Sequence, residues 1–548
     1  MKFRFLFLVI VFTVLFSVLV FNLYNIQVRK GNFYVASAKS QLENSGALHA
    51  TRGGIYFTNK ESGKIPAAIE KEYFEIFAVP DEIEDPVITA EKIFSVVSIS
   101  KSDLINLFKK PKDKYELLVK RASEEQKAFI RNNFIKEIYL KSHTERFYPL
   151  EKTASHLLGF AGVSKDSDNP SGLYGLEKFF NEKLSGKDGF AKGDGIISPV
   201  SGEDIFLNID RNIESQAEEI LSDLVLNFKA QGGSAIVSDP KNGKILAMAS
   251  LPNFNPNNYS KYPIQNFLNP ATEKVYEPGS IFKVITMAIG LDSDSITPET
   301  TYVDKGSLTI NGSTIKNWDL KAHGRQTMTN VIEQSLNTGA VFAEEQIGRS
   351  IFLEYLKKFG LGEISGISLS GEVRGNIKSL EINPKDINFA TASFGQGISV
   401  TPVSLLKAVS VIANGGNLVD FAIVQGEEDK NPQRIISEDA ARKTITMMIS
   451  AVDKALVAKI EGYNIAGKTG TAQVPDFVKG GYTKDVINTY IGFAPAYDPK
   501  FIILIKLDKP AGAPLAGQTV VPAFRKLAEF IINYYNIPPD RTEEKSSN

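Results

Sequence analysis

Residues 277–290 read Glu-Pro-Gly-Ser-Ile-Phe-Lys-Val-Ile-Thr-Met-Ala-Ile-Gly. The Pro-Gly pair interrupts the chain, and the apolar run behind it predicts a buried helix that begins near Ser280. Ser280 and Lys283 are three residues apart, so a helix places them on one face, one turn from each other. Lys283 is the only charged residue of the apolar run. The stretch therefore predicts a serine nucleophile beside a buried lysine.

The chemistry of this pair depends on the charge of Lys283. Burial disfavours the ammonium form, so the neutral amine becomes accessible as a base for the serine hydroxyl. A serine at the start of a helix also lies where a free backbone N–H can stabilise an oxyanion. On these residues alone, a lysine that extends its amine to solvent beside a helix-starting serine is an equally good interpretation.

Ser335-Leu-Asn337 follows a helical stretch at 329–334. The hydroxyl of Ser335 can relay a proton between the lysine and a leaving amine, and the amide of Asn337 can hold a substrate backbone or Lys283. The alternative is that the two polar residues simply end a helix.

Lys468-Thr469-Gly470-Thr471 follows Ile-Ala-Gly and precedes Ala-Gln-Val, as expected of a strand at the edge of a sheet. Lys468 supplies a positive field, and the hydroxyls of Thr469 and Thr471 can bind a carboxylate. Gly470 leaves space for a substrate backbone. The alternative is an ordinary strand interrupted by glycine.

The single strings are common, and only their combination is informative. On the order of two Ser-x-x-Lys matches are expected by chance in a chain of this size. A Ser-Asp-Asn string at 167–169 lies in what we expect to be a polar loop, ahead of the serine–lysine pair. Only the set at 280, 335 and 468 combines order and setting. The other serine–lysine matches are Ser98/Lys101, Ser238/Lys241 (predicted as a hairpin turn), Ser313/Lys316 and Ser404/Lys407.

Composition excludes several classes of function. The chain has 548 residues, with 62 basic and 63 acidic side chains, so several domains are expected and a nucleic-acid partner is not. Cysteine is absent, which excludes thiolate catalysis, disulfides and cysteine-based metal sites. Of four histidines, only His323 lies in the C-terminal half. We therefore expect neither a Ser-His-Asp triad nor a histidine-rich metal site there.

The N-terminus carries an apolar run at 5–21, extended to residue 26 by an interfacial stretch. We expect a short cytoplasmic tail at 1–4 and a membrane anchor at 5–26. A cleaved signal peptide is the alternative, but the Ala-Ser-Ala string at 36–38 lies beyond the basic residues that follow the apolar run. The charges that flank the anchor do not fix its orientation in the membrane. Because a large soluble part follows a very short N-terminal tail, we expect that part to lie outside the cytoplasm.

Strand signals come in two widely separated pairs, at 234–239 with 244–250 and at 489–495 with 501–507. An amphipathic helix is predicted at 213–228, another helix at 522–535, and mainly helical sequence between the strand pairs. Strands from both ends closing one antiparallel sheet, covered by helices, make an α+β domain. The polar residues 539–548 are expected to be disordered.

Taken as a set, S-x-x-K, S-x-N and K-T-G resemble the penicillin-recognising acyl transferases. The N-terminal half resembles the pedestal of class B penicillin-binding proteins. This resemblance implies a non-catalytic pedestal of the dimerisation type at 27–205 and a transpeptidase domain at 206–538. The pedestal motifs are Arg-Gly-Gly-Ile at 52–55, Arg-Phe-Tyr-Pro at 146–149, Tyr-Gly-Leu-Glu-Lys at 174–178 and Leu-Ser-Gly-Lys-Asp-Gly at 184–189.

The resemblance implies a bacterial, single-pass membrane enzyme whose catalytic domain lies outside the cytoplasm. It would be a peptidoglycan D,D-transpeptidase that cross-links stem peptides through a serine acyl-enzyme and is inhibited by β-lactams. The motif at 394–402 is more similar to division-type than to elongation-type enzymes, so a membrane glycosyltransferase and other cell-wall synthesis or division proteins are expected partners. The implied catalytic residues are Ser280, Lys283, Ser335, Asn337 and Lys468, and the implied substrate-binding residues are Thr469, Gly470, Thr471 (whose N–H would be the second oxyanion donor) and Trp318.

Other functions remain compatible with parts of the sequence. Trp318, the lone tryptophan, fits core packing as well as a cleft wall. Residues 333–337 also spell Glu-x-x-Leu-Asn, which resembles the deacylating motif of class A β-lactamases, so a β-lactam-sensing or hydrolysing relative is one alternative. This β-lactamase-like string overlaps Ser335 and Asn337, so the same residues cannot fill both roles, which opposes a hydrolase. A catalytically inactive division scaffold is another alternative, which the intact serine and lysines oppose.

Overall fold

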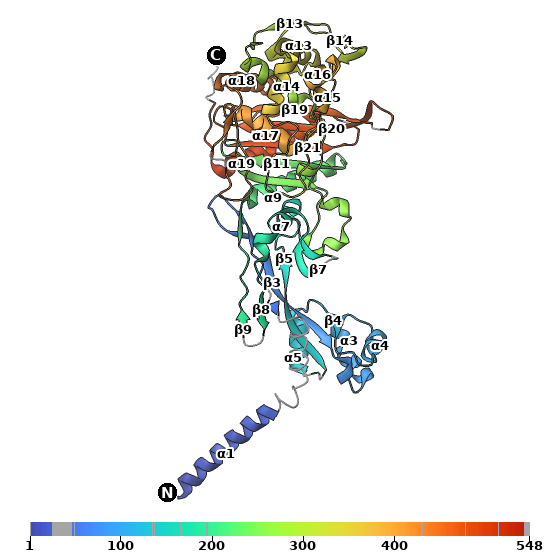
Figure 1. The fold of residues 1–548 in the computed structure, drawn as a ribbon, viewed down its shortest axis with the longest axis vertical. Helices are drawn as coiled ribbons and strands as arrows, with labels where there is room; N and C mark the ends of the chain where they lie inside the picture. The colour runs from blue at the N-terminus through green and yellow to red at the C-terminus, as the bar shows by residue number, and fades with distance from the viewer. Residues whose placement is uncertain are drawn as a thin grey trace. The chain divides into compact units, whose positions relative to one another are not determined.

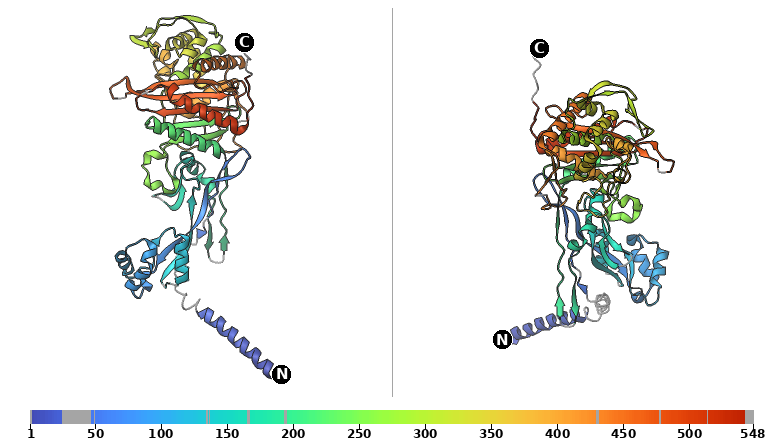
Figure 2. Two further views of the ribbon diagram at one scale, coloured as in Figure 1. Left: turned by 180° about the vertical axis from the view of Figure 1, so that it is seen from behind. Right: turned by 45° about the horizontal axis from the view of Figure 1, so that its top comes forward.

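The computed structural model describes residues 2–24, 47–48, 50–133, 135, 137–164, 167–192, 195–428, 431–476, 478–512 and 514–541 (Figures 1 and 2). Its internal contacts divide the chain into two units. Unit 1 comprises Met1–Gly53, Glu70–Phe147 and Ser185–Glu203, and unit 2 comprises Gly54–Ile69, Tyr148–Leu184 and Asp204–Asn548.

Unit 1 packs three helices against strands. The second part of β3 (Ile65–Ala78) pairs with β4 (Glu116–Val119) and β5 (Ile138–Phe147), and Ile76 and Ala78 bring its buried face into the core. Asp85 begins the first of these helices by accepting hydrogen bonds from the N–H groups of Val87 and Ile88. The helices are α3 (Pro86–Val97), α4 (Lys101–Phe108) and α5 (Glu124–Asn133); η2 (Pro80–Glu82) and a sheet of β1 (Ala47–Leu48), β8 (Gly189–Lys192) and β9 (Gly195–Ile197) complete the unit.

The N-terminal helix α1 runs from Lys2 to Tyr24. In the part of the chain that the structure describes, no helix is both long and apolar enough to cross a membrane. The predicted anchor at 5–26 extends outside the described residues, and so does most of the tail predicted at 539–548. In the described part of that tail, Arg541 forms a two-pronged ion pair with Asp453 at 2.7 and 3.0 Å.

Unit 2 is built on one five-stranded antiparallel sheet with the order β12-β11-β21-β20-β19. Its strands are β11 (Gly232–Ser238), β12 (Ile245–Leu251), β19 (Ala466–Pro475), β20 (Tyr482–Ala494) and β21 (Phe501–Asp508). Both predicted hairpins and the closing of one sheet by strands from the two ends of the domain are therefore confirmed. The hairpin turn predicted at Ser238–Lys241 is confirmed as well.

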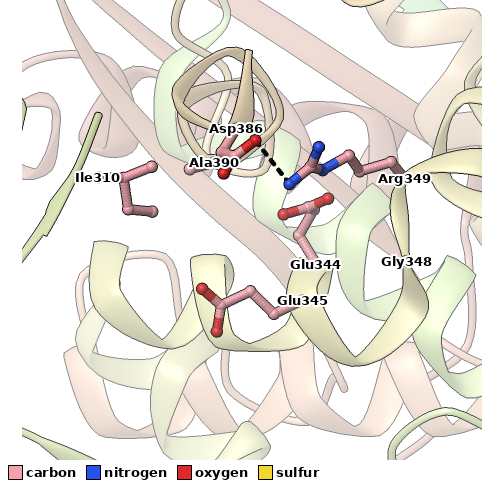
Figure 3. A pocket seen from close by; sticks show the side chains of 7 residues that line it. All are labelled: Ile310, Glu344, Glu345, Gly348, Arg349, Asp386 and Ala390. Atoms are coloured by element: carbon pink, nitrogen blue, oxygen red, sulfur yellow. Dashed lines mark ion pairs between the residues drawn. The ribbon is translucent and has the colours of Figure 1, made fainter. Parts of the chain in front are cut away.

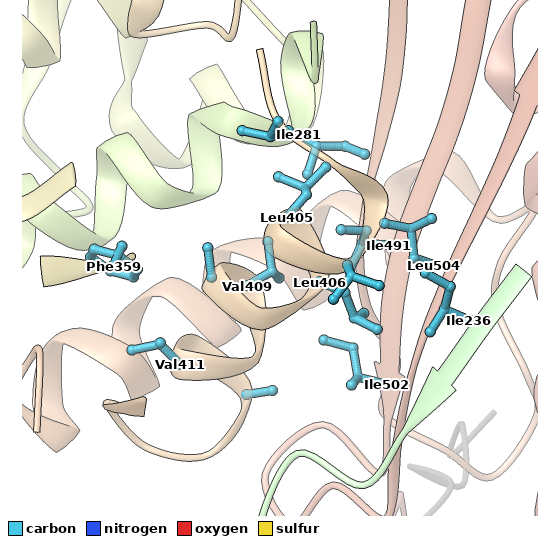
Figure 4. Packing of buried hydrophobic residues seen from close by; sticks show 14 of the residues in the cluster. Ile236, Ile281, Phe359, Leu405, Leu406, Val409, Val411, Ile491, Ile502 and Leu504 are labelled. Atoms are coloured by element: carbon cyan, nitrogen blue, oxygen red, sulfur yellow. The ribbon is translucent and has the colours of Figure 1, made fainter. Parts of the chain in front are cut away.

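Alternating side chains of the sheet supply two cores. On one face Ile236, Ile491, Ile502 and Leu504 pack against α17 (Pro402–Ala413), as Figure 4 shows. On the other face the next residues along β21, such as Ile503, pack with α9 (Arg211–Asn227) and α19 (Val520–Tyr535). A strand that is apolar on both faces is expected only where helices cover both sides of a sheet.

The remaining elements of unit 2 surround this sheet. β7 begins at Ser167 and pairs with β6, so the prediction of a loop at 167–169 is wrong. The strands are β2 (Ile55–Thr58), β6 (Ala161–Ser164), β7 (Ser167–Gly172), β10 (Ile205–Asp210), β13 (Thr301–Asp304), β14 (Ser307–Ile310), β15 (Ser313–Lys316), β16 (Gly324–Thr327), β17 (Asn417–Leu418) and β18 (Gln433–Arg434).

Between the two hairpins helices outweigh strands, as predicted, although the short strands β13 to β18 also lie there. The helices of unit 2 not yet described are α6 (Ser155–Leu158), α7 (Gly175–Phe179) and α8 (Asn181–Ser185, of which the last residue belongs to unit 1) ahead of the first hairpin, and η6 (Ala516–Gln518) after the second. Those between the hairpins are η3 (Pro256–Lys261), η4 (Ile264–Phe267), α10 (Pro270–Glu273), η5 (Gly279–Ile281), α11 (Phe282–Asp292), α12 (Met328–Gln334), α13 (Asn337–Ile347), α14 (Arg349–Lys358), α15 (Lys378–Glu381), α16 (Asp386–Ala392) and α18 (Glu438–Ala455).

Candidate active site

Ser280 lies in the short 3-10 turn η5, which leads directly into the buried helix α11. Gly279 begins this turn with a φ of +58°, and a Cβ there would lie 3.1 Å from the Cβ of Ala472 on the edge strand β19. The N–H of Gly279 donates to the carbonyl of Gly395 at 3.1 Å. Glycine is therefore needed before the serine both for its backbone angle and for the close approach of the strand.

Lys283 is completely buried, one turn after the serine. Its Nζ lies 3.1 Å from Ser280 Oγ and 2.6 Å from the carbonyl oxygen of Ser335. Burial places the pKa of Lys283 well below that of an ordinary lysine, and the positive charge of Lys468 lowers it further. The alternative of a lysine that extends to solvent is thereby excluded.

Ser335 lies in the break between α12 and α13. Its backbone adopts the left-handed conformation (φ 57°, ψ 45°), which costs about 1–2 kcal/mol for a residue with a side chain. In this conformation its carbonyl reaches Lys283, while its hydroxyl lies 3.2 Å from the Nζ of Lys283 and 3.0 Å from that of Lys468. The hydroxyl of Ser335 thus connects the two lysine amines.

Lys468 enters the site from the edge strand β19 and is only 4% exposed. Besides Ser335, its amine contacts the carbonyl of Thr469 at 3.1 Å. Burial lowers the pKa of Lys468 to about 7. Two lysines within reach of one hydroxyl, both with depressed pKa values, can exchange protons through it.

Gly470 follows on the same strand, but the space beside it is not open to a substrate as the sequence predicts. A Cβ there would lie 2.9 Å from the carbonyl oxygen of Pro278 and 3.1 Å from the side chain of Ile281. The space beside Gly470 is therefore filled by the turn that carries the serine. This packing requires glycine whether or not a substrate also approaches.

Thr469 and Thr471 lie on the edge strand and are both half-buried. The hydroxyl of Thr471 accepts a hydrogen bond from the N–H of Ala516 at 3.2 Å, and its own proton remains available to an acceptor. Thr469 Oγ1 is 3.5 Å from the amine of Lys468. Thr469 thus lies beside the amine of Lys468, whereas the hydroxyl of Thr471 contacts Ala516.

Asn337 and Trp318 lie beside the Ser335 break. The amide of Asn337 donates to the carbonyl of Lys316 at 2.8 Å; among the described residues no hydrogen bond joins it to Lys283. Trp318 is 61% exposed, so core packing of this residue is excluded. Its indole N–H donates at 3.0 Å to the carbonyl of Gln334, the last residue of α12.

A buried polar network that the sequence analysis missed fixes the start of α13. Asp304 accepts from the amide of Asn317 at 2.8 Å and from the hydroxyl of Thr338, also at 2.8 Å. The side-chain oxygen of Asn317 accepts in turn from the N–H of Asn337 at 3.0 Å. Pairwise spacing in the sequence gives no signal for this network, because its members come from three separate elements.

Glu277, immediately before the serine turn, was also missed. One carboxyl oxygen accepts from Tyr482 on β20 at 3.0 Å, and the other accepts from the N–H of Gly397 at 3.1 Å. Glu277 therefore connects the turn to the β19–β20 hairpin and to the 395–397 loop. Burial raises the pKa of its carboxyl.

No metal is implied by the charged residues. Among the described residues, no group of three or more histidine, aspartate or glutamate side chains is arranged to hold a metal ion. The arrangement instead provides a serine hydroxyl, two deprotonable amines and a second hydroxyl between them. Such a set can activate a serine for attack on an acyl group.

Comparison with known proteins places this geometry in a family. The family described as "Penicillin binding protein transpeptidase domain" matches residues 233–529, more than half of the chain. The chain belongs to the penicillin-binding protein transpeptidases. A second family, described as "Penicillin-binding Protein dimerisation domain", matches residues 47–193. This penicillin-binding protein is therefore of class B, with an N-terminal dimerisation domain and a C-terminal transpeptidase domain.

Individual relatives resemble the chain over most of its length. Stage V sporulation protein D of Bacillus subtilis is 31% identical over 93% of this chain and 83% of its own. Peptidoglycan D,D-transpeptidase FtsI of Escherichia coli K12 is 29% identical over 78% of this chain and 74% of its own. The crystal structure of penicillin binding protein 2X from Streptococcus thermophilus, at 22% identity, matches with a TM-score of 0.74 over 89% of this chain and 80% of that one, which shows the fold.

The penicillin-binding protein contains a second buried Ser-x-x-Lys on a helix, which serves as an internal comparison. Ser404 and Lys407 lie on α17, but Ser404 Oγ contacts Thr401 at 2.8 Å, and Lys407 donates to Asp420 at 2.6 Å. Lys283 instead contacts Ser280 and Ser335, so of these two helical pairs the one at 280 and 283 has the geometry of a nucleophile and base.

Glu333, the residue of the β-lactamase-like motif, is directed away from this chemistry. Its carboxylate accepts from Ser450 at 2.5 Å, from Asn330 at 2.8 Å and from the ammonium of Lys454. Burial raises the pKa of Glu333, but these hydrogen bonds outweigh burial and hold the pKa below its usual value. Glu333 thus fastens the end of α12 to α18.

Replacing Lys468 with alanine tests the coupling between the two lysines. The substitution removes a positive charge that lowers the pKa of Lys283, so that pKa should rise. Acylation by penicillin requires Lys283 to be neutral, and the low-pH limb of its rate profile should therefore move to higher pH. The measurement is the pH profile of the acylation rate with a fluorescent penicillin, and the control is Lys316→Ala. A limb that stays in place or moves to lower pH would contradict the coupling.

Proposed function

We propose that Ser280 is the nucleophile with which this transpeptidase cross-links the stem peptides of peptidoglycan, as a D,D-transpeptidase. The observation that carries the proposal is the continuous chain of hydrogen-bonding groups Ser280–Lys283–Ser335–Lys468, with neighbouring atoms 3.0 to 3.2 Å apart. The relatives named FtsI carry the description peptidoglycan D,D-transpeptidase, which agrees with this chemistry.

In the acylation half-reaction, the neutral amine of Lys283 takes the proton of the Ser280 hydroxyl. Ser280 Oγ then bonds to the carbonyl carbon of the penultimate D-Ala of a stem peptide. The oxyanion is stabilised by the backbone N–H groups of Ser280 and Thr471, and the positive field of Lys468 adds to this effect. An amine whose pKa is depressed by burial can accept the proton without a histidine.

The departing D-Ala needs a proton on its nitrogen as the peptide bond breaks. The hydroxyl of Ser335 contacts both lysines, and it can pass a proton from Lys283 or Lys468 to that nitrogen. In the second half-reaction the amine of a neighbouring stem peptide attacks the acyl carbon. The bond from that carbon to Ser280 Oγ breaks, and the proton lost by the amine passes through the same groups to Ser280 Oγ. The cycle is ping-pong and requires neither a metal nor an organic cofactor.

Substrate recognition is proposed for the residues around the lysines. Thr469 and Thr471 would bind the terminal carboxylate with their hydroxyls, beside Lys468. The backbone of the strand at Gly470 would pair with the extended stem peptide. Trp318 is exposed next to the Ser335 break, and Asn337 holds the neighbouring backbone of Lys316, so both would shape the wall of the cleft. A β-lactam would enter the same site as a mimic of D-Ala-D-Ala.

The cellular role that fits best is septal cell-wall synthesis in a bacterium, or wall synthesis during sporulation. Relatives with the names FtsI and stage V sporulation protein D support this proposal, together with the motif at 394–402. A membrane glycosyltransferase and other cell-wall or division proteins are the proposed partners. Residues 5–26 are proposed to anchor the enzyme in the cell membrane, with the transpeptidase domain outside the cytoplasm.

Ser280→Ala tests the nucleophile. We expect covalent labelling by a fluorescent penicillin to disappear, because no oxygen remains for the acyl bond, while thermal unfolding is nearly unchanged. The matched control is Ser404→Ala, which truncates the serine of the second helical Ser-x-x-Lys and should retain labelling. Full labelling of Ser280→Ala would show that another residue, such as Ser335, is acylated.

Glu333→Gln distinguishes a transpeptidase from a hydrolase. A transpeptidase must keep its acyl group until an amine arrives, and the carboxylate of Glu333 is occupied by α18 and by Asn330. We therefore expect penicillin to be hydrolysed far more slowly than it acylates the enzyme, and the variant to release its acyl group at nearly the original rate. Rapid turnover of penicillin that is lost in Glu333→Gln would favour a hydrolase.

Removing residues 2–30 tests the membrane anchor. The shortened protein should leave the membrane fraction of cells and still be labelled by a fluorescent penicillin when purified, because the proposed catalytic groups all lie in unit 2. Retention of the shortened protein in the membrane fraction would contradict a single N-terminal anchor. Detection of a mature protein that has been cleaved after residue 38 would contradict the anchor as well.

A further inference from the structure

A pocket lies in unit 2 at the far end of α13 from the Ser335 break. Its volume is about 440 Å³, and it is formed by α13, α14, α16 and the end of β14 (Figure 3). The helix α13 begins at Asn337, and the pocket residues of this helix lie about two turns further along it. The lining residues are Ile310, Glu344, Glu345, Gly348, Arg349, Asp386 and Ala390.

Glu344 is the unusual member of this set. The residue is 4% exposed, and within the part of the chain that the structure describes its Oε1 has no hydrogen-bond partner. Figure 3 shows its carboxyl group directed towards the side of the pocket where Arg349 and Asp386 lie. A buried polar atom without a partner costs about 1–3 kcal/mol, so such a group at the wall of a cavity points to a missing ligand.

The charges around Glu344 favour a cationic ligand. Arg349 is the one basic residue of the lining, and its guanidinium already pairs with Asp386 at 2.7 Å. Glu345 adds a further carboxylate on the same helix as Glu344. The lining therefore holds three acidic groups and one arginine, which leaves it acidic.

The apolar part of the lining limits the shape of the ligand. Ile310 comes from β14 and Ala390 from α16; Figure 3 shows Ile310 on the side of the pocket away from Arg349 and Ala390 between Ile310 and Asp386. Ala390 belongs to a cluster of buried side chains against which Ile310 packs; its other members are Ile315, Ala340, Val341 and Phe394. A ligand with a charged end and a short aliphatic stem would match a carboxyl group at one side and apolar contacts at the other.

We propose that this pocket binds an alkylammonium group, with the ammonium on the carboxylate of Glu344 and the aliphatic stem between Ile310 and Ala390. Two sources share this chemistry: a free aliphatic amine, and the side chain of a lysine-type diamino acid carried by a peptide. The site is separate from the proposed catalytic groups, and its occupancy requires no acyl transfer.

Binding should be coupled to the release of a proton. Burial raises the pKa of Glu344 to about 7, and the neighbouring Glu345 and Asp386 act in the same direction, while Arg349 opposes them. Part of the unliganded protein therefore carries a protonated Glu344 at neutral pH. An ammonium ion on this group stabilises the carboxylate, lowers its pKa and so displaces the proton.

The test is isothermal titration calorimetry of the full-length protein with pentylammonium chloride at pH 7, in two buffers that differ in ionisation enthalpy. We expect saturable binding with release of a fraction of one proton. Glu344→Gln should weaken binding about ten- to hundredfold and abolish the proton release, because a charge-assisted hydrogen bond is lost. The matched control, Glu354→Gln on the exposed face of α14, should bind as the original protein does.

Two further titrations, with pentan-1-ol and with a peptide, complete the test. Pentan-1-ol, which has the stem without the charge, should bind far more weakly than the ammonium. An Nα-acetylated peptide with one lysine identifies the source: binding of the peptide indicates a peptide-borne side chain, and binding of pentylammonium alone indicates a free amine. Penicillin labelling of Glu344→Gln verifies that the variant is folded. Absence of pentylammonium binding, or unchanged binding in folded Glu344→Gln, would overturn the proposal.

Discussion

The burial of Lys283 is the constraint on which the rest of the site depends. An amine taken out of water loses the stabilisation of its charged form, and here a second lysine, also buried, lies one hydroxyl away. Within the described residues neither lysine forms an ion pair with a carboxylate, and the partners of both amines are hydroxyl and carbonyl groups. At the second helical serine–lysine pair of the same domain, Lys407 donates a hydrogen bond to Asp420 and Ser404 contacts Thr401, so that serine and lysine have other partners.

Three separate parts of the chain must be held together for this arrangement. The edge strand β19 brings Lys468, and its glycine allows the serine turn to approach closely. The left-handed Ser335 directs both its carbonyl and its hydroxyl to the lysines. Glu333 and the network of Asp304 and Asn317 fasten the helices on either side of Ser335, so the strain at this residue is supported from both sides.

The sequence by itself determined the architecture of the transpeptidase domain and the residue types of its site. Strand-forming runs at both ends of the domain predicted one antiparallel sheet, because period-2 and continuous apolar runs are local properties of the chain. The order of the three motifs identified Ser280, Lys283, Ser335 and Lys468 against several other Ser-x-x-Lys matches. The resemblance carried by those motifs also gave the family, which the comparisons confirm.

Only the tertiary structure decided what each group contacts. Whether Lys283 was buried or extended to solvent, whether Trp318 was in the core, and why Gly470 is glycine all depend on neighbours distant in the sequence. The supporting contacts of Glu277, Glu333 and Asp304, and the unpartnered carboxyl of Glu344, arise in the same way. Local patterns record which residues prefer burial, whereas pKa values and hydrogen bonds depend on the partners that packing supplies.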